Sequence, residues 1–141
     1  MRTSIIRPTI AVVLGLVSGF IVMAIMEAVS SSFYPPPATL DRHSKTALEA
    51  YIQGLPIGAF MWVLAAHGLG AFVAGFVFRA IVGKPCLIGA CVVGGTCLLG
   101  GISNLLLISH PIWFTMIDPM LYLPMAILGG MAIARFLRTI G

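Results

Sequence analysis

Four long apolar segments follow one another along the chain, separated by short polar or proline-containing stretches. They cover approximately residues 8–29, 56–82, 85–109 and 119–137, and each opens with a proline: Pro8, Pro56, Pro85 and Pro119. At about 1.5 Å per helical residue, each segment is long enough to cross a hydrocarbon layer of about 30 Å. The pattern therefore predicts one all-α domain, residues 1–141, with four membrane-spanning helices.

The tight Gly83-Lys84 turn makes the second and third spans antiparallel neighbours, and we expect an antiparallel four-helix transmembrane bundle. Between the first two spans, residues 41–53 predict a short extracytoplasmic helix with Asp41 or Ser44 as its N-cap and Gly54 at its end. The first span also resembles a signal peptide. Its long apolar core and the Gly15-x-x-x-Gly19 pairing motif favour a retained helix instead.

Small residues line one face of every predicted span, which allows helix backbones to approach closely in a membrane. The widest such face belongs to residues 86–109, so this segment is expected at the centre of the bundle. The predicted helix-packing positions are Gly15, Gly19, Gly70, Ala74, Gly94, Gly101, Gly129 and Gly130.

Hydrophobic residues make up 60% of the chain and charged residues only 9%, which excludes a water-soluble fold. The eight basic residues form no patch, so no nucleic-acid partner is expected. Six of them lie on one side of the predicted spans (Arg2, Arg7, Arg79, Lys84, Arg135 and Arg138), and only Arg42 and Lys45 lie on the other. The positive-inside rule then places both termini in the cytoplasm.

His67 is the one ionisable side chain predicted near mid-membrane, on a helix face that points into the bundle. Such groups are costly in a bilayer and often act as proton relays or ligands. The alternative is a neutral imidazole bonded to a neighbouring helix, because no partner is expected at its depth. Glu27 and Asn104 are predicted at similar height near the outer end, where they could bond to each other or line a vestibule to His67.

The outer face holds the remaining candidates: Asp41, His43, His110 and Asp118. Asp118 precedes Pro119, which is the sequence of a helix N-cap followed by a first-turn proline. No pair among these four residues has the spacing of metal ligands, and the three cysteines match no metal motif. No metal, cofactor or catalytic motif is found, so we expect no enzyme.

Several short motifs resemble those of a group of small bacterial four-span membrane proteins without an assigned activity. The motifs are Met26-Glu27, Tyr34-Pro35, Leu55-Pro56, Ala59-Phe60, Gly70 to Gly75, Asn104, His110 to Phe114, Pro124 and Leu128-Gly129. The resemblance implies a multi-pass protein of the bacterial inner membrane and adds nothing on chemistry.

Two main functions are compatible with these features, and a third, an outer metal-binding protein that uses Asp41, His43, His110 and Asp118, has weaker support. The first is a non-catalytic inner-membrane protein that works by helix association, with itself or as a small subunit of a larger membrane complex. The second is a small proton or cation transporter or channel that uses His67, with Glu27 and Asn104 at the outer end. The second predicts a polar cavity that reaches His67.

Overall fold

The computed structural model describes residues 3–84 and 86–140 and contains five helices within them. These are α1 (Thr3–Phe33), α2 (Lys45–Gln53), α3 (Ile57–Val82), α4 (Leu87–Leu107) and α5 (Ile112–Ile140). All except α2 are long and apolar enough to cross a membrane. The predicted roles of Arg2 and Pro85 fall on residues outside the described part, as does the side chain of Arg138.

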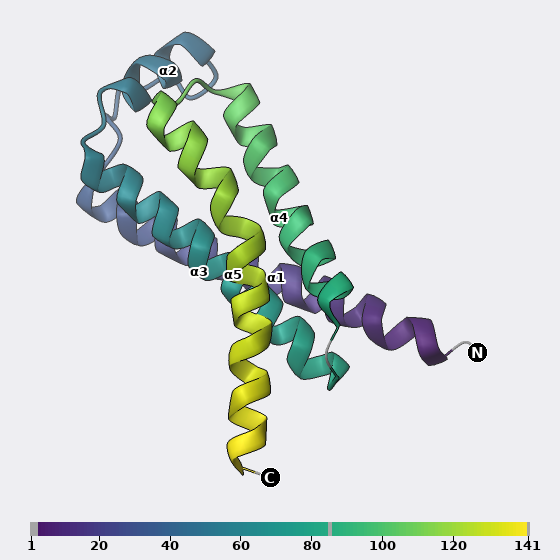
Figure 1. Ribbon diagram of the computed structural model, residues 1–141. Helices are drawn as coiled ribbons and strands as arrows, with labels where there is room; N and C mark the ends of the chain where they lie inside the picture. Colours follow the sequence, from purple (N-terminus) through teal and green to yellow (C-terminus); the bar gives the residue numbers. More distant parts are fainter. Residues whose placement is uncertain (1–2, 85, 141) are drawn as a thin grey trace.

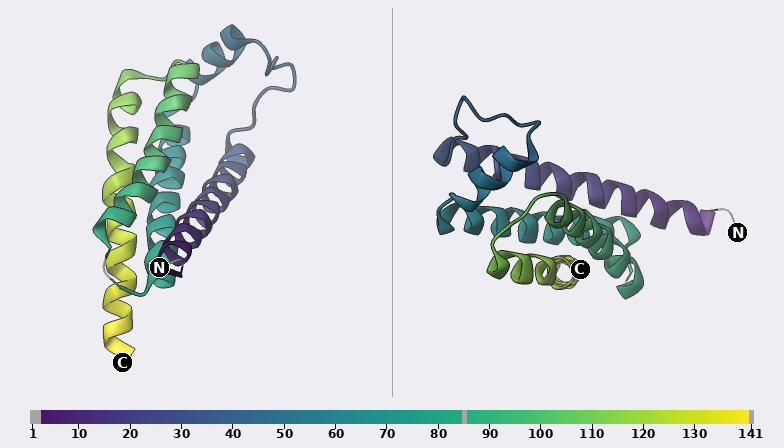
Figure 2. Two further views of the ribbon diagram at one scale, coloured as in Figure 1. Left: turned by 90° about the vertical axis from the view of Figure 1, so that its right-hand side faces the viewer. Right: turned by 90° about the horizontal axis from the view of Figure 1, so that it is seen from above.

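Helix α3 is the centre of the bundle, because it packs against α1, α4 and α5 (Figures 1 and 2). Helix α4 packs mainly on α5 and only lightly on α3 and α1. The prediction that residues 86–109 lie at the centre is therefore wrong. Small residues determine how closely a neighbouring helix can approach, but not how much of a helix its neighbours cover.

Local signals explain most helix boundaries. The Ser44 side chain accepts a hydrogen bond from the Ala47 N–H, so Ser44 is the N-cap of α2, and Gly54 is its C-cap. Pro56 is the N-cap of α3. Gly83 ends α3 with a φ of 79°, a left-handed conformation that only glycine adopts without strain.

Helix α5 does not begin at Pro119 as predicted. It begins directly after Pro111, so Pro119 and Pro124 both lie inside it. Each internal proline lacks an N–H and leaves one carbonyl of the preceding turn without its helical hydrogen bond. The helix bends about halfway along (Figure 1). This earlier start also places Asp118 inside the helix rather than at its cap.

Most of the predicted packing residues are used where α3 meets its neighbours. A Cβ atom added to Gly15 would lie 2.7 Å from the Ala74 carbonyl oxygen, and one added to Gly19 would lie 2.6 Å from that of Gly70. A Cβ added to Gly129 would clash with the Phe72 carbonyl oxygen. Gly130 is different, because its nearest contacts would be an ordinary 3.7 Å away.

Helix α2 lies at the same end of the bundle as the connection between α4 and α5, whereas the C-terminus lies at the opposite end (Figure 1). Glu49 of α2 accepts hydrogen bonds from the Ser109 hydroxyl at 2.8 Å and the Ser109 N–H at 3.3 Å. At the opposite end, the Arg7 Nε donates to the Ile81 carbonyl at 2.8 Å and so links α1 to α3. We call the first of these ends the α2 end.

Candidate functional site

A buried hydrogen-bonded cluster joins α3 to α5. The His67 Nδ1 atom lies 2.6 Å from Oδ1 of Asp118 and 2.8 Å from the Tyr122 hydroxyl. The same hydroxyl donates to Oδ2 of Asp118 at 3.2 Å. His67 is 7% exposed, and Asp118 and Tyr122 are each 1% exposed. The three side chains therefore form one polar cluster inside the bundle.

An ionised carboxylate only accepts hydrogen bonds. An ionised Asp118 therefore fits the tautomer of His67 with its proton on Nδ1, which donates to Oδ1, while the Tyr122 hydroxyl donates to Oδ2. Two such hydrogen bonds offset part of the free-energy cost of burying an ionised carboxylate. In a neutral imidazole the second ring nitrogen, Nε2, is then a free proton acceptor.

Sequence reasoning missed this pairing and expected no partner for His67 at its own depth. Asp118 was assigned to the outer face as a helix cap because Pro119 follows it. In the structure the α5 helix already starts at Ile112, and the Asp118 side chain is buried in the bundle. One available signal was the spacing of Asp118 and Tyr122, because residues four apart share a helix face.

The Nε2 atom of His67 faces Glu27 of α1, whose Oε1 is 3.7 Å away. The Glu27 side chain is 55% exposed. Both side chains line a cavity of about 380 Å³ to which all four long helices contribute. Its lining residues are Phe20, Met23, Ala24, Glu27, His67, Cys97, Gly100, Gly101, Asn104 and Tyr122. We call this the inner cavity.

Asn104 thus lines the same cavity as Glu27 and His67. No hydrogen bond joins Glu27 to Asn104 among the described residues, so the bond considered from the sequence is not formed. Glu27 instead has its nearest polar partner in His67. The Nδ1 side of the His67 imidazole therefore contacts Asp118, and its Nε2 side faces the inner cavity and Glu27.

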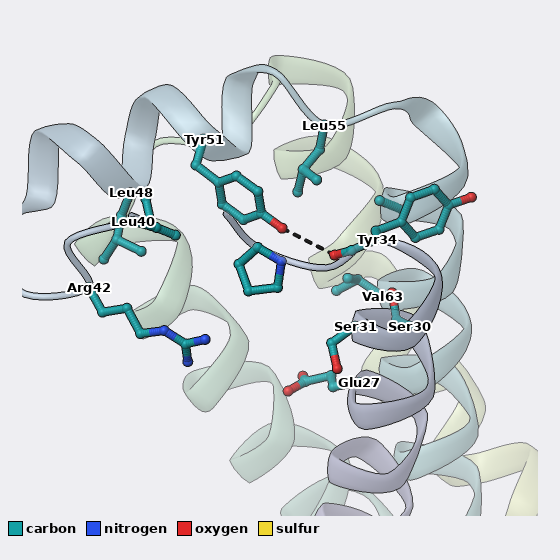
Figure 3. A pocket seen from close by; sticks show the side chains of 12 residues that line it. Glu27, Ser30, Ser31, Tyr34, Leu40, Arg42, Leu48, Tyr51, Leu55 and Val63 are labelled. Carbon is teal, nitrogen blue, oxygen red and sulfur yellow. Dashed lines mark hydrogen bonds between the residues drawn. The ribbon is translucent and has the colours of Figure 1, made fainter. Parts of the chain in front are cut away.

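Glu27 also lines a second cavity of about 520 Å³ at the α2 end, which we call the outer cavity. Its wall consists of the end of α1, the following proline-rich segment, α2 and the start of α3. The Tyr51 hydroxyl donates to the Tyr34 carbonyl at 3.3 Å and closes one side of it (Figure 3). Arg42 and Glu27 extend into the outer cavity from opposite sides (Figure 3). One carboxylate is therefore common to both cavities.

The other predicted outer-face residues do not join this site. The Asp41 carboxylate accepts from the His43 backbone N–H at 2.9 Å in a local turn. The His110 ring bonds to the Ile108 carbonyl through Nδ1 at 2.7 Å and stacks on Phe114. Within residues 3–84 and 86–140, no group of three histidine, cysteine or acidic side chains could hold a metal ion.

The site can therefore accept and release a proton at Nε2 of His67 while Asp118 holds the opposite side of the ring. Two carboxylates flanking one imidazole stabilise its charged form in an apolar surrounding. Comparison with protein-family models, curated proteins and solved structures gives no match for this chain. The site geometry is thus the basis for the functional argument.

Proposed function

We propose that the protein is a small proton transporter of the membrane, in which His67 exchanges protons with the inner cavity. The observation that carries this proposal is the position of the imidazole, with Nδ1 held 2.6 Å from the buried Asp118 carboxylate and Nε2 facing Glu27. A protonated His67 would carry a positive charge between the Asp118 and Glu27 carboxylates, and both carboxylates stabilise that charge. Proton relays in membranes use such chains of acids and histidines.

The two cavities support access from the α2 end. Glu27 lines both of them, so a water chain through the outer cavity would reach His67 by way of this carboxylate. On the far side of the cluster the helices pack tightly, and Ala74, Phe78 and Val93 are at most 1% exposed. This closed half favours a transporter with alternating access over an open channel.

A proton is favoured over a metal cation. Asp118 and Tyr122 already hydrogen-bond to Nδ1 of His67 and to each other, and no group of three histidine, cysteine or acidic side chains that could hold a metal ion is found among the described residues. Hydrogen-bonded imidazole, phenol and carboxylate groups pass protons without the coordination shell that a metal ion needs.

The test is proton flux into liposomes that contain the purified protein and a pH-sensitive dye, driven by a potassium diffusion potential. We expect wild-type protein to acidify the lumen and His67→Gln to reduce the flux to that of protein-free liposomes. His43→Gln is the matched control, because His43 is an exposed histidine in the loop before α2. A folded His67→Gln variant with wild-type flux would overturn the proposal.

We also infer an antiparallel bundle with both termini in the cytoplasm of a bacterial cell and α2 outside the membrane. Four candidate spans and the position of α2 and the C-terminus at opposite ends of the bundle support this topology (Figure 1). The excess of lysine and arginine at the end away from α2 gives the orientation. Cysteine labelling from outside the cell at His43 and Thr139 would test it, and only the former should react.

Helix association is a second candidate function, but fewer small residues support it than the sequence suggests. The small residues that motivated it are mostly buried within the chain itself, against α3 and α5. Two exceptions are Gly95 and Gly100 on α4, where an added Cβ would meet no atom within 4 Å. The two positions lie about 140° apart around the helix and do not share a face. Gly100 lines the inner cavity, so Gly95 is the position that leaves room for a second helix. A dimer in detergent that Gly95→Ile dissociates would support helix association, and a strictly monomeric chain would count against it.

A further inference from the structure

The outer cavity is lined by two side chains of opposite charge, Arg42 and Glu27, that do not pair with each other in the described part of the chain. Arg42 forms no ion pair and no hydrogen bond there, and the only charged neighbour of Glu27 is His67 on its other side. Both side chains line the cavity, yet they form no ion pair with each other (Figure 3). A ligand in this cavity would therefore be close to a positively charged side chain, Arg42, and a separate negatively charged one, Glu27.

Two further features distinguish this cavity from a chance surface hollow. Its volume of about 520 Å³ is within the range of about 300–1,000 Å³ typical of small-molecule sites. Ser30 also lines it beside Glu27 and is 8% exposed as a residue, so its hydroxyl can donate or accept one hydrogen bond with a ligand.

The wall between the two charges is mainly apolar. Leu40, Leu48 and Leu55 contribute to it, together with the ring of Tyr51. A ligand that fills this cavity therefore needs a positive group for Glu27, a negative group for Arg42 and a hydrocarbon portion between or beside them. Guanidinium groups bind carboxylate and phosphate oxygens in a two-pronged geometry.

We propose that the outer cavity is a binding site for a small zwitterion that carries an ammonium group and a carboxylate or phosphate. The ammonium lies against Glu27 and Ser30, and the acidic group lies against Arg42. This inference deepens the proposed function, because the ligand would share Glu27 with the proton on His67. The zwitterion can be a free solute of the amino-acid type or the ethanolamine headgroup of a phospholipid, since the recognising chemistry is the same.

Equilibrium binding to the purified full-length chain in detergent tests the site without any proton movement. The probes are L-leucine and glycerophosphoethanolamine, each compared with single-charge analogues: 3-methylbutylamine and 4-methylpentanoate for leucine, ethanolamine and glycerol phosphate for the other. We expect one zwitterion to bind at least about tenfold more tightly than either of its analogues, because two charge-assisted contacts replace one. Preference for leucine identifies a free solute, and preference for glycerophosphoethanolamine identifies a lipid headgroup.

Matched variants then assign the contacts. Arg42→Gln should weaken zwitterion binding by about ten- to a hundredfold and leave binding of the amine analogue unaffected. Glu27→Gln should weaken zwitterion binding to a similar extent and leave binding of the acidic analogue unaffected. Lys45→Gln is the control, because Lys45 is an exposed cation of α2 that does not line the cavity. Binding by neither zwitterion above its analogues, or unchanged affinity in Arg42→Gln, would overturn the proposal.

The two proposals can fail separately. His67→Gln should retain zwitterion binding within a few fold, because His67 does not line the outer cavity. Arg42→Gln should retain proton flux in liposomes made without zwitterion and without ethanolamine lipids. Loss of binding with intact proton flux would therefore reject only the zwitterion site, and the opposite result would reject only the proton transporter.

Discussion

His67 and Asp118 are 51 residues apart in the sequence, and their Nδ1 and Oδ1 atoms lie 2.6 Å apart inside the bundle. This contact joins the central helix α3 to α5, and its acceptor residue, Asp118, is 1% exposed. Removing either partner leaves the other without its hydrogen bond in an apolar surrounding. The contact is therefore both a structural link and the fixed side of the proposed proton site.

Asp118→Ala should lower the free energy of unfolding in detergent by about 3 kcal/mol, because the His67 Nδ1–H and the Tyr122 hydroxyl lose their common acceptor. Asp41→Ala is the control, since its carboxylate is exposed in a loop, and it should cost about 1 kcal/mol or less. Chemical denaturation followed by circular dichroism measures both. Equal stabilities of the two variants would contradict a buried pair at Asp118.

Tyr122→Phe should be milder than Asp118→Ala. It removes only the hydroxyl that donates to Oδ2 and leaves the bond between Nδ1 and Oδ1 in place. The expected cost is about 1 kcal/mol. In the liposome assay we expect a reduced but measurable proton flux, in contrast to its loss in His67→Gln. Loss of flux as complete as in His67→Gln would mean that the phenol itself carries the proton.

Gly100 and Gly101 form a matched pair on α4. A Cβ added to Gly101 would clash with the Tyr122 hydroxyl, whereas one added to Gly100 would meet nothing within 4 Å. Gly101→Ala should therefore destabilise the protein by about 1–3 kcal/mol by displacing the Tyr122 ring. Gly100→Ala should be neutral or stabilise the helix by up to about 1 kcal/mol. Thermal unfolding measures the stability of both variants. A Gly101→Ala protein as stable as Gly100→Ala, or more stable, would contradict the prediction.

Acid should release α2 from the connection between α4 and α5. Hydrogen bonds from the Ser109 side chain and backbone, with a smaller contribution from Lys45, lower the pKa of Glu49 below its ordinary value of 4.5. Because the folded-state pKa is lowered, the docking is fully stable above pH 4.5 and weakens as the pH falls through the lowered pKa. The protection of residues 45–53 against amide hydrogen exchange, taken relative to the intrinsic rate at each pH, should therefore fall as the pH drops below 4.5.

Ser109→Ala is the check on this pH dependence. Without the Ser109 hydroxyl, the pKa of Glu49 should rise, so the loss of protection should begin at a higher pH than in the wild-type protein. An exchange profile that is identical in both proteins would show that α2 is held by other contacts.

The sequence predicted the helices well, because their signals are local. The hydrophobic runs correspond to α1, α3, α4 and α5, and the inward direction of His67 followed from the residues that share its helix face. Ser44 was one of two capping candidates for α2 and is the cap observed. Each of these features depends on residues within a few positions of one another.

The site was harder to predict because it depends on which helices meet. A proline can open a helix or lie within one, and the sequence around Pro119 does not distinguish the two cases. If Pro119 starts a span, Asp118 is predicted at the outer surface and His67 has no predicted partner. The outer cavity was not predicted at all, because it depends on how the segment from Tyr34 to Ser44 folds over α3.

The contact between Gly101 and Tyr122 has a consequence for how this protein can change during evolution. The phenol reaches the Asp118 carboxylate only because α4 has no side chain at position 101. A larger residue there would require a smaller one at position 122, and the carboxylate would then lose a donor. Homologous chains that keep a histidine at 67 and an aspartate at 118 should accordingly keep glycine at 101, and lineages that lose one of the three should lose the others.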